Sequence, residues 1–128
     1  MNREAPRILV IDDDEAVRRT LAELLRRDAY IVATAPNGQA ALALVEHEVF
    51  DLVLLDLWMP GLSSWEVAQR LLAQRPTLAI LVLTGDSMAE YERERWLAAG
   101  IEYLLKTSAP WDVLRRIAAA LAEREVAM

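Results

Sequence analysis

Short apolar runs alternate five times with segments of helical periodicity, and this alternation constrains the fold more than any other feature of the chain. Strands that alternate with helices of this length predict βαβ units, a parallel sheet and right-handed crossovers that place helices on both faces. We therefore expect an α/β fold, a three-layer (βα)5 sandwich that forms one domain over residues 1–128. The expected strands cover residues 8–11, 30–33, 52–56, 78–83 and 101–105.

The third run is apolar without alternation and ends on the carboxylate of Asp56, shortly before a break at Pro60-Gly61. Absence of alternation predicts a strand that is covered on both faces. A buried charge is costly unless it is paired or bound to a metal. Other parts of the chain must therefore supply partners for Asp56, or Asp56 must lie at the solvent-accessible C-terminal end of its strand.

Composition excludes several classes of protein. Without cysteine the chain has no disulfide framework, thiol nucleophile or zinc–thiolate site. A net charge of −6 argues against direct nucleic-acid binding, which needs clustered Lys and Arg. No apolar run approaches the ~20 residues that span a bilayer. Residues 1–6 lack the apolar core of a signal peptide, so we expect a cytoplasmic protein without membrane contact.

Residue types that cap helices mark where several helices begin and end. Asp14 is placed to cap the first helix, and Ser63 with Glu66 fits a capping box at the start of the third. Gly100 follows a strongly charged helix, expected from about residue 88 to 99, as its C′ residue.

Four of the five expected strands end on polar or charged residues: Asp12-Asp13, Asp56, Thr84 and Lys106. In open parallel sheets, ligands bind beyond the carboxyl ends of the strands. Three carboxylates that converge there repel one another unless a cation lies between them, and oxygen ligands select Mg²⁺ or Mn²⁺. A carboxylate nucleophile, a metal ion, a lysine and a hydroxyl amount to a phosphoryl-transfer site built on Asp56.

These stretches, in this order, resemble the receiver domain of a two-component response regulator over residues 8 to about 121. The resemblance implies a flavodoxin-like sheet of order 2-1-3-4-5. It rests on Ile8-Leu9-Val10-Ile11-Asp12-Asp13, Asn37-Gly38, Leu55-Asp56 with Met59-Pro60-Gly61, Leu83-Thr84 and Tyr103-Leu104-Leu105-Lys106.

By this resemblance, Asp56 accepts a phosphoryl group from a sensor histidine kinase. Asp13 and Asp56 bind Mg²⁺ directly, Asp12 acts mostly through water, and the Trp58 carbonyl is a further ligand. The domain is a signalling module that phosphorylates and dephosphorylates itself rather than a turnover enzyme.

The resemblance also implies a switch. Lys106 bridges to the phosphoryl group, while Thr84 bonds it and moves inward. Tyr103 follows and repacks the face formed by the fourth helix, the fifth strand and the fifth helix. A downstream output domain or protein recognises that face, and a homodimer formed through it stays an open alternative.

The sequence departs from the family at several positions near the expected site. Thr107 stands where the family has proline after the lysine, which predicts a trans peptide and a different loop. Ser63-Ser64 replaces the common Asp-Gly, and we expect only a local change there. The side chains of Trp58 and Asp86 should overhang the site and modulate hydrolysis of the acyl phosphate.

Other interpretations stay open at this point. The chain could be a receiver-like interaction module that acts without phosphorylation, or an aspartate-nucleophile phosphatase built on Asp12-x-Asp14. A flavodoxin-like cofactor carrier would need a phosphate-cradling loop after the first strand, which the sequence lacks. Tyr103 could be a simple strand aromatic. The remaining tryptophans fit packing roles, two of them alternatively the output face: Trp65, Trp96 and Trp111.

Overall fold

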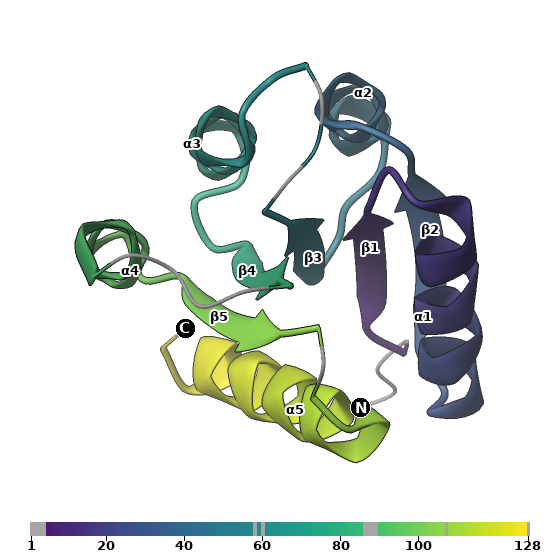
Figure 1. Ribbon diagram of the computed structural model, residues 1–128. Helices are drawn as coiled ribbons and strands as arrows, with labels where there is room; N and C mark the ends of the chain where they lie inside the picture. Colours follow the sequence, from purple (N-terminus) through teal and green to yellow (C-terminus); the bar gives the residue numbers. More distant parts are fainter. Residues whose placement is uncertain (1–4, 58, 60, 86–89, 107, 128) are drawn as a thin grey trace.

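The computed structural model of the chain describes residues 5–57, 59, 61–85, 90–106 and 108–127. Within these residues five strands and five helices alternate, as the sequence predicts (Figure 1). The strands are β1 (Arg7–Ile11), β2 (Ile31–Ala35), β3 (Leu52–Asp56), β4 (Ala79–Thr84) and β5 (Glu102–Leu105). The helices are α1 (Glu15–Arg27), α2 (Gly38–His47), α3 (Ser64–Gln74), α4 (Glu90–Ala98) and α5 (Pro110–Ala127).

The strands form one parallel sheet of order β2-β1-β3-β4-β5, which confirms the flavodoxin-like order. All five residues of β3 are buried, between β1 on one side and β4 on the other. The apolar run without alternation therefore reflects a central strand with both faces covered.

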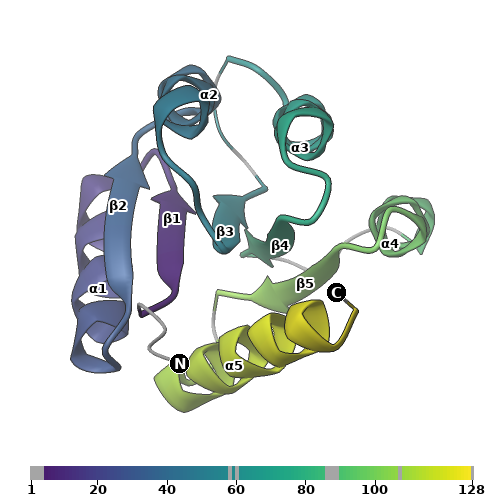
Figure 2. The same cartoon turned by 180° about the vertical axis from the view of Figure 1, so that it is seen from behind.

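Helices cover both faces of the sheet (Figure 1; Figure 2). One core cluster joins α2, α3 and α4 to one face, and a second joins α1 and α5 to the other. Alternate residues of β3 enter the two clusters, since Val53 and Leu55 lie in the first and Leu52 and Leu54 in the second. Among the described residues, no helix is both long and apolar enough to cross a membrane.

Three strands begin one residue later than the sequence predicts, and the reason is the same each time. The backbone N–H of Tyr30 donates to the Leu25 carbonyl, that of Leu78 to Arg75, and that of Ile101 to Trp96. Each of these donors closes the end of the preceding helix or turn and is not available to the sheet. β2 also runs on to Ala35, because Thr34 and Ala35 pair with Val10 and Ile11.

The predicted helix signals are largely confirmed. Asp14 Oδ1 accepts from the backbone N–H of Val17, and Ser63 Oγ accepts from that of Glu66. Of the capping box only this half forms among the described residues, because Glu66 Oε2 instead lies 3.6 Å from Arg70. Gly100 adopts a φ of +79°, the left-handed conformation expected after a helix.

Candidate functional site

The predicted polar residues meet at one edge of the sheet, here called the carboxyl edge and defined by Asp12, Asp56, Thr84 and Lys106. Asp56 and Thr84 are the last residues of β3 and β4, while Asp12 and Lys106 directly follow β1 and β5. Asp12, Asp56 and Thr84 are 1%, 3% and 0% exposed. Parallel pairing brings these strand ends together, so the fold itself assembles the site.

Three carboxylates lie close together there. Asp12, Asp13 and Asp56 each offer one oxygen, and these oxygens lie within 4.8 Å of one another. Asp13 is exposed, whereas the other two are buried, so the cluster opens to solvent on the Asp13 side. Oxygen-only donors at this spacing fit a hard cation such as Mg²⁺ or Mn²⁺, which keeps several waters and takes further oxygen ligands.

Lys106 is the cation that faces this cluster. Its Nζ lies 3.0 Å from Asp56 Oδ1 and 3.1 Å from Asp12 Oδ2. Partial burial lowers the pKa of Lys106, but its bonds to Asp56 and Asp12 and their charges outweigh this effect. The net result is a pKa raised above 10.5, so the side chain is an ammonium at neutral pH.

Arg18 and Asp14 fix the loop that carries Asp12. Arg18 Nη1, from the first turns of α1, donates to the Asp12 carbonyl at 2.8 Å. The backbone N–H of Asp14 donates to Asp12 Oδ1 at 2.9 Å, which leaves Oδ2 to face Lys106. Asp14 itself caps α1 and is not in the carboxylate cluster, in agreement with its predicted role.

A buried hydroxyl fixes the loop after Asp56. Ser64 Oγ lies 2.6 Å from the Asp56 carbonyl oxygen and 2.8 Å from that of Leu57. The sequence marked Ser63 as a cap but assigned no role to Ser64 or Arg18. A polar residue at the start of a helix that follows a site strand is the signal that could have indicated both.

Other predicted residues have mixed outcomes. Tyr103 is half-buried on β5, paired with Val82, and packs against the cluster beneath α2, α3 and α4. Trp96 is fully buried and contacts Trp65 edge to face at 5.0 Å, as expected of packing residues. Trp111 is 64% exposed, so the packing interpretation is wrong for this residue, and the alternative, a place on the output face, stays a prediction. The predicted positions Trp58, Asp86 and Thr107 lie outside the described residues.

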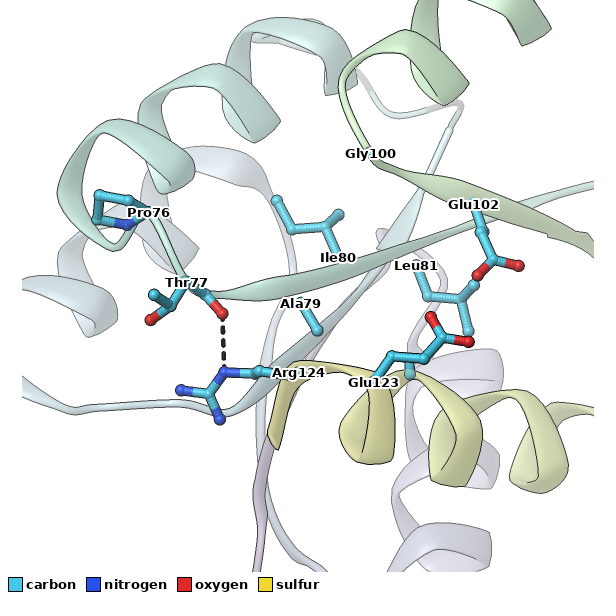
Figure 3. Close-up of a pocket in the computed structure, with 10 residues that line it drawn as sticks. Pro76, Thr77, Ala79, Ile80, Leu81, Gly100, Glu102, Glu123 and Arg124 are labelled. Atoms are coloured by element: carbon cyan, nitrogen blue, oxygen red, sulfur yellow. Dashed lines mark hydrogen bonds between the residues drawn. The ribbon is translucent and has the colours of Figure 1, made fainter. Parts of the chain in front are cut away.

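A pocket of about 350 Å³ lies at the opposite edge of the sheet, far along the strands from the carboxylates (Figure 3). We call this the amino edge and define it by Arg7, Asp51, Ala79 and Glu102. The pocket lies between the starts of β4 and β5 and the end of α5, where Arg124 Nε donates to the Thr77 carbonyl. The pocket is therefore separate from the predicted phosphoryl-transfer site at the carboxyl edge.

Comparison with known sequences gives one consistent result. Residues 8–118 match the family model of the response regulator receiver domain. The response regulator MprA of Mycolicibacterium vanbaalenii is 43% identical over 117 residues, which are 90% of this chain and 50% of that protein. The alkaline phosphatase synthesis transcriptional regulatory protein PhoP of Bacillus subtilis is 36% identical, over 94% of this chain and 50% of its own length. The chain thus spans about half the length of these relatives.

Solved structures give the same picture. A CheY-like receiver domain protein of Methanospirillum hungatei superposes with a TM-score of 0.90 at 30% identity, covering 97% of this chain and 99% of that one. The response regulator TrrA of Thermotoga maritima, crystallised in complex with Mg²⁺–BeF, has a TM-score of 0.78 at 36% identity. It covers 91% of this chain and 98% of its own.

Proposed function

The chain belongs to the response regulator receiver domain family, and from this premise we propose that Asp56 accepts a phosphoryl group from a sensor histidine kinase. Receiver domains are signalling modules of two-component systems. The observation that carries the proposal is the meeting of three carboxylates within 4.8 Å, two of them buried, with an ammonium 3.0 Å from Asp56.

The proposed chemistry is an in-line displacement at phosphorus. A carboxylate oxygen of Asp56 forms the new P–O bond while the P–N bond of the phosphohistidine breaks, and the freed imidazole nitrogen takes up a proton. Lys106 changes from a partner of two carboxylates to a partner of the phosphoryl oxygens. The Thr84 hydroxyl, at the end of β4, would bond the same group.

A divalent cation is part of this proposal. Asp12, Asp13 and Asp56 would hold Mg²⁺ or Mn²⁺, and the Trp58 carbonyl is proposed as a further ligand. When bound, the ion offsets the negative charge of the phosphoryl oxygens. The chain's own carboxylates exceed the charge of Lys106, and this excess is the electrostatic support for a cation at the site.

We further propose that phosphorylation changes the face of α4, β5 and α5 through Thr84 and Tyr103. A downstream output domain or protein is the proposed partner of that face. The same proposal places the chain in the cytoplasm with its kinase.

The test is intact mass spectrometry after incubation with acetyl phosphate and Mg²⁺. We expect a single adduct of about 80 Da, the mass of one added phosphoryl group. It should require Mg²⁺ and disappear in Asp56→Asn. Asp51→Asn is the matched control, because it changes an aspartate near the start of the same strand and should keep the adduct.

Two other outcomes are informative. If the protein takes no adduct but is stabilised by Mg²⁺ with beryllium fluoride, the phosphoaspartate forms and is short-lived. If it binds neither phosphoryl group nor beryllium fluoride, the proposal is wrong and the chain acts as a phosphate-independent interaction module. Sustained hydrolysis of a phosphate ester would instead identify a phosphatase.

A further inference from the structure

A serine at the start of α3 reaches the backbone of the proposed phosphoacceptor. Ser64 is 4% exposed, and its hydroxyl lies 2.6 Å from the Asp56 carbonyl oxygen and 2.8 Å from the Leu57 carbonyl oxygen. One hydroxyl proton is thus shared between two acceptors on consecutive residues. A hydroxyl in this position links the third helix to the acceptor residue without passing through any side chain of the cluster.

The two carbonyls lie where β3 ends and the loop begins. Pairing between β1 and β3 ends with Ile11 opposite Leu55, so no paired residue of β1 lies opposite Asp56. On the other side, the backbone N–H of Leu57 donates to the Leu83 carbonyl of β4 at 2.9 Å. A buried carbonyl group needs a hydrogen-bond donor, and the Ser64 hydroxyl supplies one to these two consecutive carbonyls.

We propose that Ser64 is a positioning residue for Asp56: its hydroxyl holds the main chain of Asp56 and Leu57 in the conformation that binds the cation and accepts the phosphoryl group. This inference rests on the function proposed above. Leu57 is held by β4 through its N–H and by α3 through its carbonyl, so the start of the loop is fixed from two elements.

The expected consequence follows from how metal and phosphoryl sites depend on their supporting bonds. Groups that orient the ligands of an ion affect its affinity by roughly ten- to hundredfold when they are removed. Ser64 acts on the main chain and not on the carboxylate, so we expect an effect at or below the lower end of that range. The change should appear in cation affinity even without a phosphodonor.

Ser63 and Ser64 offer a matched pair of variants. Ser63→Ala removes the hydroxyl that accepts from the Glu66 N–H at 3.2 Å, a bond within α3 that does not reach Asp56. Ser64→Ala removes the neighbouring hydroxyl and keeps the same Cβ. Both variants should lower the urea midpoint, and that loss measures the purely structural role of each hydroxyl.

The experiment measures Mg²⁺ affinity by calorimetry, and then the rate of phosphorylation by acetyl phosphate at saturating Mg²⁺. We expect Ser64→Ala to weaken Mg²⁺ binding three- to tenfold and to slow phosphorylation, while Ser63→Ala keeps both within twofold of the wild type. Ser64→Cys, which retains a weak donor of similar size, should give intermediate values.

Equal Mg²⁺ affinities for Ser64→Ala and Ser63→Ala would overturn the inference, as would a loss for Ser64→Ala confined to the urea midpoint. Failure of the proposed function looks different. In that case the wild type itself takes no phosphoryl group, and the Mg²⁺ affinities of the two variants still decide whether Ser64 positions the site.

Discussion

The two edges of the sheet both carry charged residues, yet they balance charge differently. At the carboxyl edge, Asp12 and Asp56 share the single ammonium of Lys106, and Asp13 adds a third carboxylate. At the amino edge two acids pair one to one with arginines. Asp51 pairs with Arg124 at 2.7 Å, and Glu48 pairs with Arg7 at 2.6 Å.

This difference in charge balance indicates a binding site at the carboxyl edge and structural ion pairs at the amino edge. These ion pairs of the amino edge join β1 and α5 to the loop between α2 and β3, and the charges within each pair cancel. At the carboxyl edge three carboxylates face the ammonium of Lys106, and the Arg18 guanidinium bonds the Asp12 main chain; the negative charge still exceeds the positive, which favours binding of a cation. Lys106 is also the only lysine of the chain, whose 14 basic residues are otherwise arginine. A compact ammonium can give way to a metal ion more readily than a planar guanidinium.

Removing Lys106 should produce the largest change. Lys106→Met removes the ammonium that two buried carboxylates share, and breaking a buried pair costs about 3–5 kcal/mol. Because Lys106 is partly exposed, we expect a smaller loss of about 2 kcal/mol in the free energy of unfolding without Mg²⁺. Saturating Mg²⁺ should restore more stability to the variant than it adds to the wild type, as urea unfolding with and without the ion would measure.

The single lysine supplies a direct control. Nitrogen-15 labelling of lysine side chains gives one Nζ signal from the wild type, which should shift when Mg²⁺ is added. Equal stabilisation of Lys106→Met and wild type by Mg²⁺, with no shift of that signal, would mean that the ion binds away from the carboxyl edge.

Breaking the amino edge should have a smaller effect that stays local. Arg124→Met loses the ion pair to Asp51 at 2.7 Å. It also loses the bond to the Thr77 carbonyl, likewise at 2.7 Å (Figure 3). Both lie near the surface, so we expect a loss of about 1–2 kcal/mol in the free energy of unfolding. Mg²⁺ affinity should stay within twofold of the wild type.

Arg115→Met is the control for this variant, since Arg115 lies on the same helix and forms an exposed pair with Asp112 at 3.7 Å. Its effect should fall below about 0.5 kcal/mol. A large change in Mg²⁺ affinity in Arg124→Met would show that the two edges are coupled. The amino edge would then affect the cation site and would not be purely structural.

The spacing of apolar residues predicted the element order, because a central strand such as β3 is apolar at consecutive positions, whereas a helix repeats its apolar residues every three to four positions. It misplaced the starts of β2, β4 and β5 by one residue. Tyr30, Leu78 and Ile101 are hydrophobic and adjoin apolar runs, yet their N–H groups bond backward to Leu25, Arg75 and Trp96. Side-chain pattern reports burial, whereas a strand boundary depends on where a backbone donor finds its acceptor.

The carboxylates and Lys106 were predictable because each directly ends a strand, and parallel pairing brings strand ends together. Ser64 and Arg18 were missed because both act on carbonyl groups, which every residue carries, and their position at the start of a helix after a site strand was the one available signal. Trp111 failed for another reason. The residue type alone suggested that this tryptophan packs in the core, but Trp111 lies on the exposed side of α5.

The smallest effect that we expect lies beside the amino edge, at Tyr30 before β2. Burial, and after it the nearby charge of Asp28, raises the pKa of the Tyr30 hydroxyl above 10.0. The folded protein therefore holds this proton more tightly than the unfolded chain does. The contribution of this group to the free energy of unfolding is fully present below pH 10. It is lost as the pH rises through the pKa that Tyr30 has in the folded protein. Tyr30→Phe removes this dependence, so the urea midpoint of the wild type should fall slightly more than that of the variant between pH 9 and 11. Deprotonation of Lys106 affects both proteins alike and cancels in the difference. Parallel curves for the two proteins would mean that Tyr30 titrates as it does in the unfolded chain.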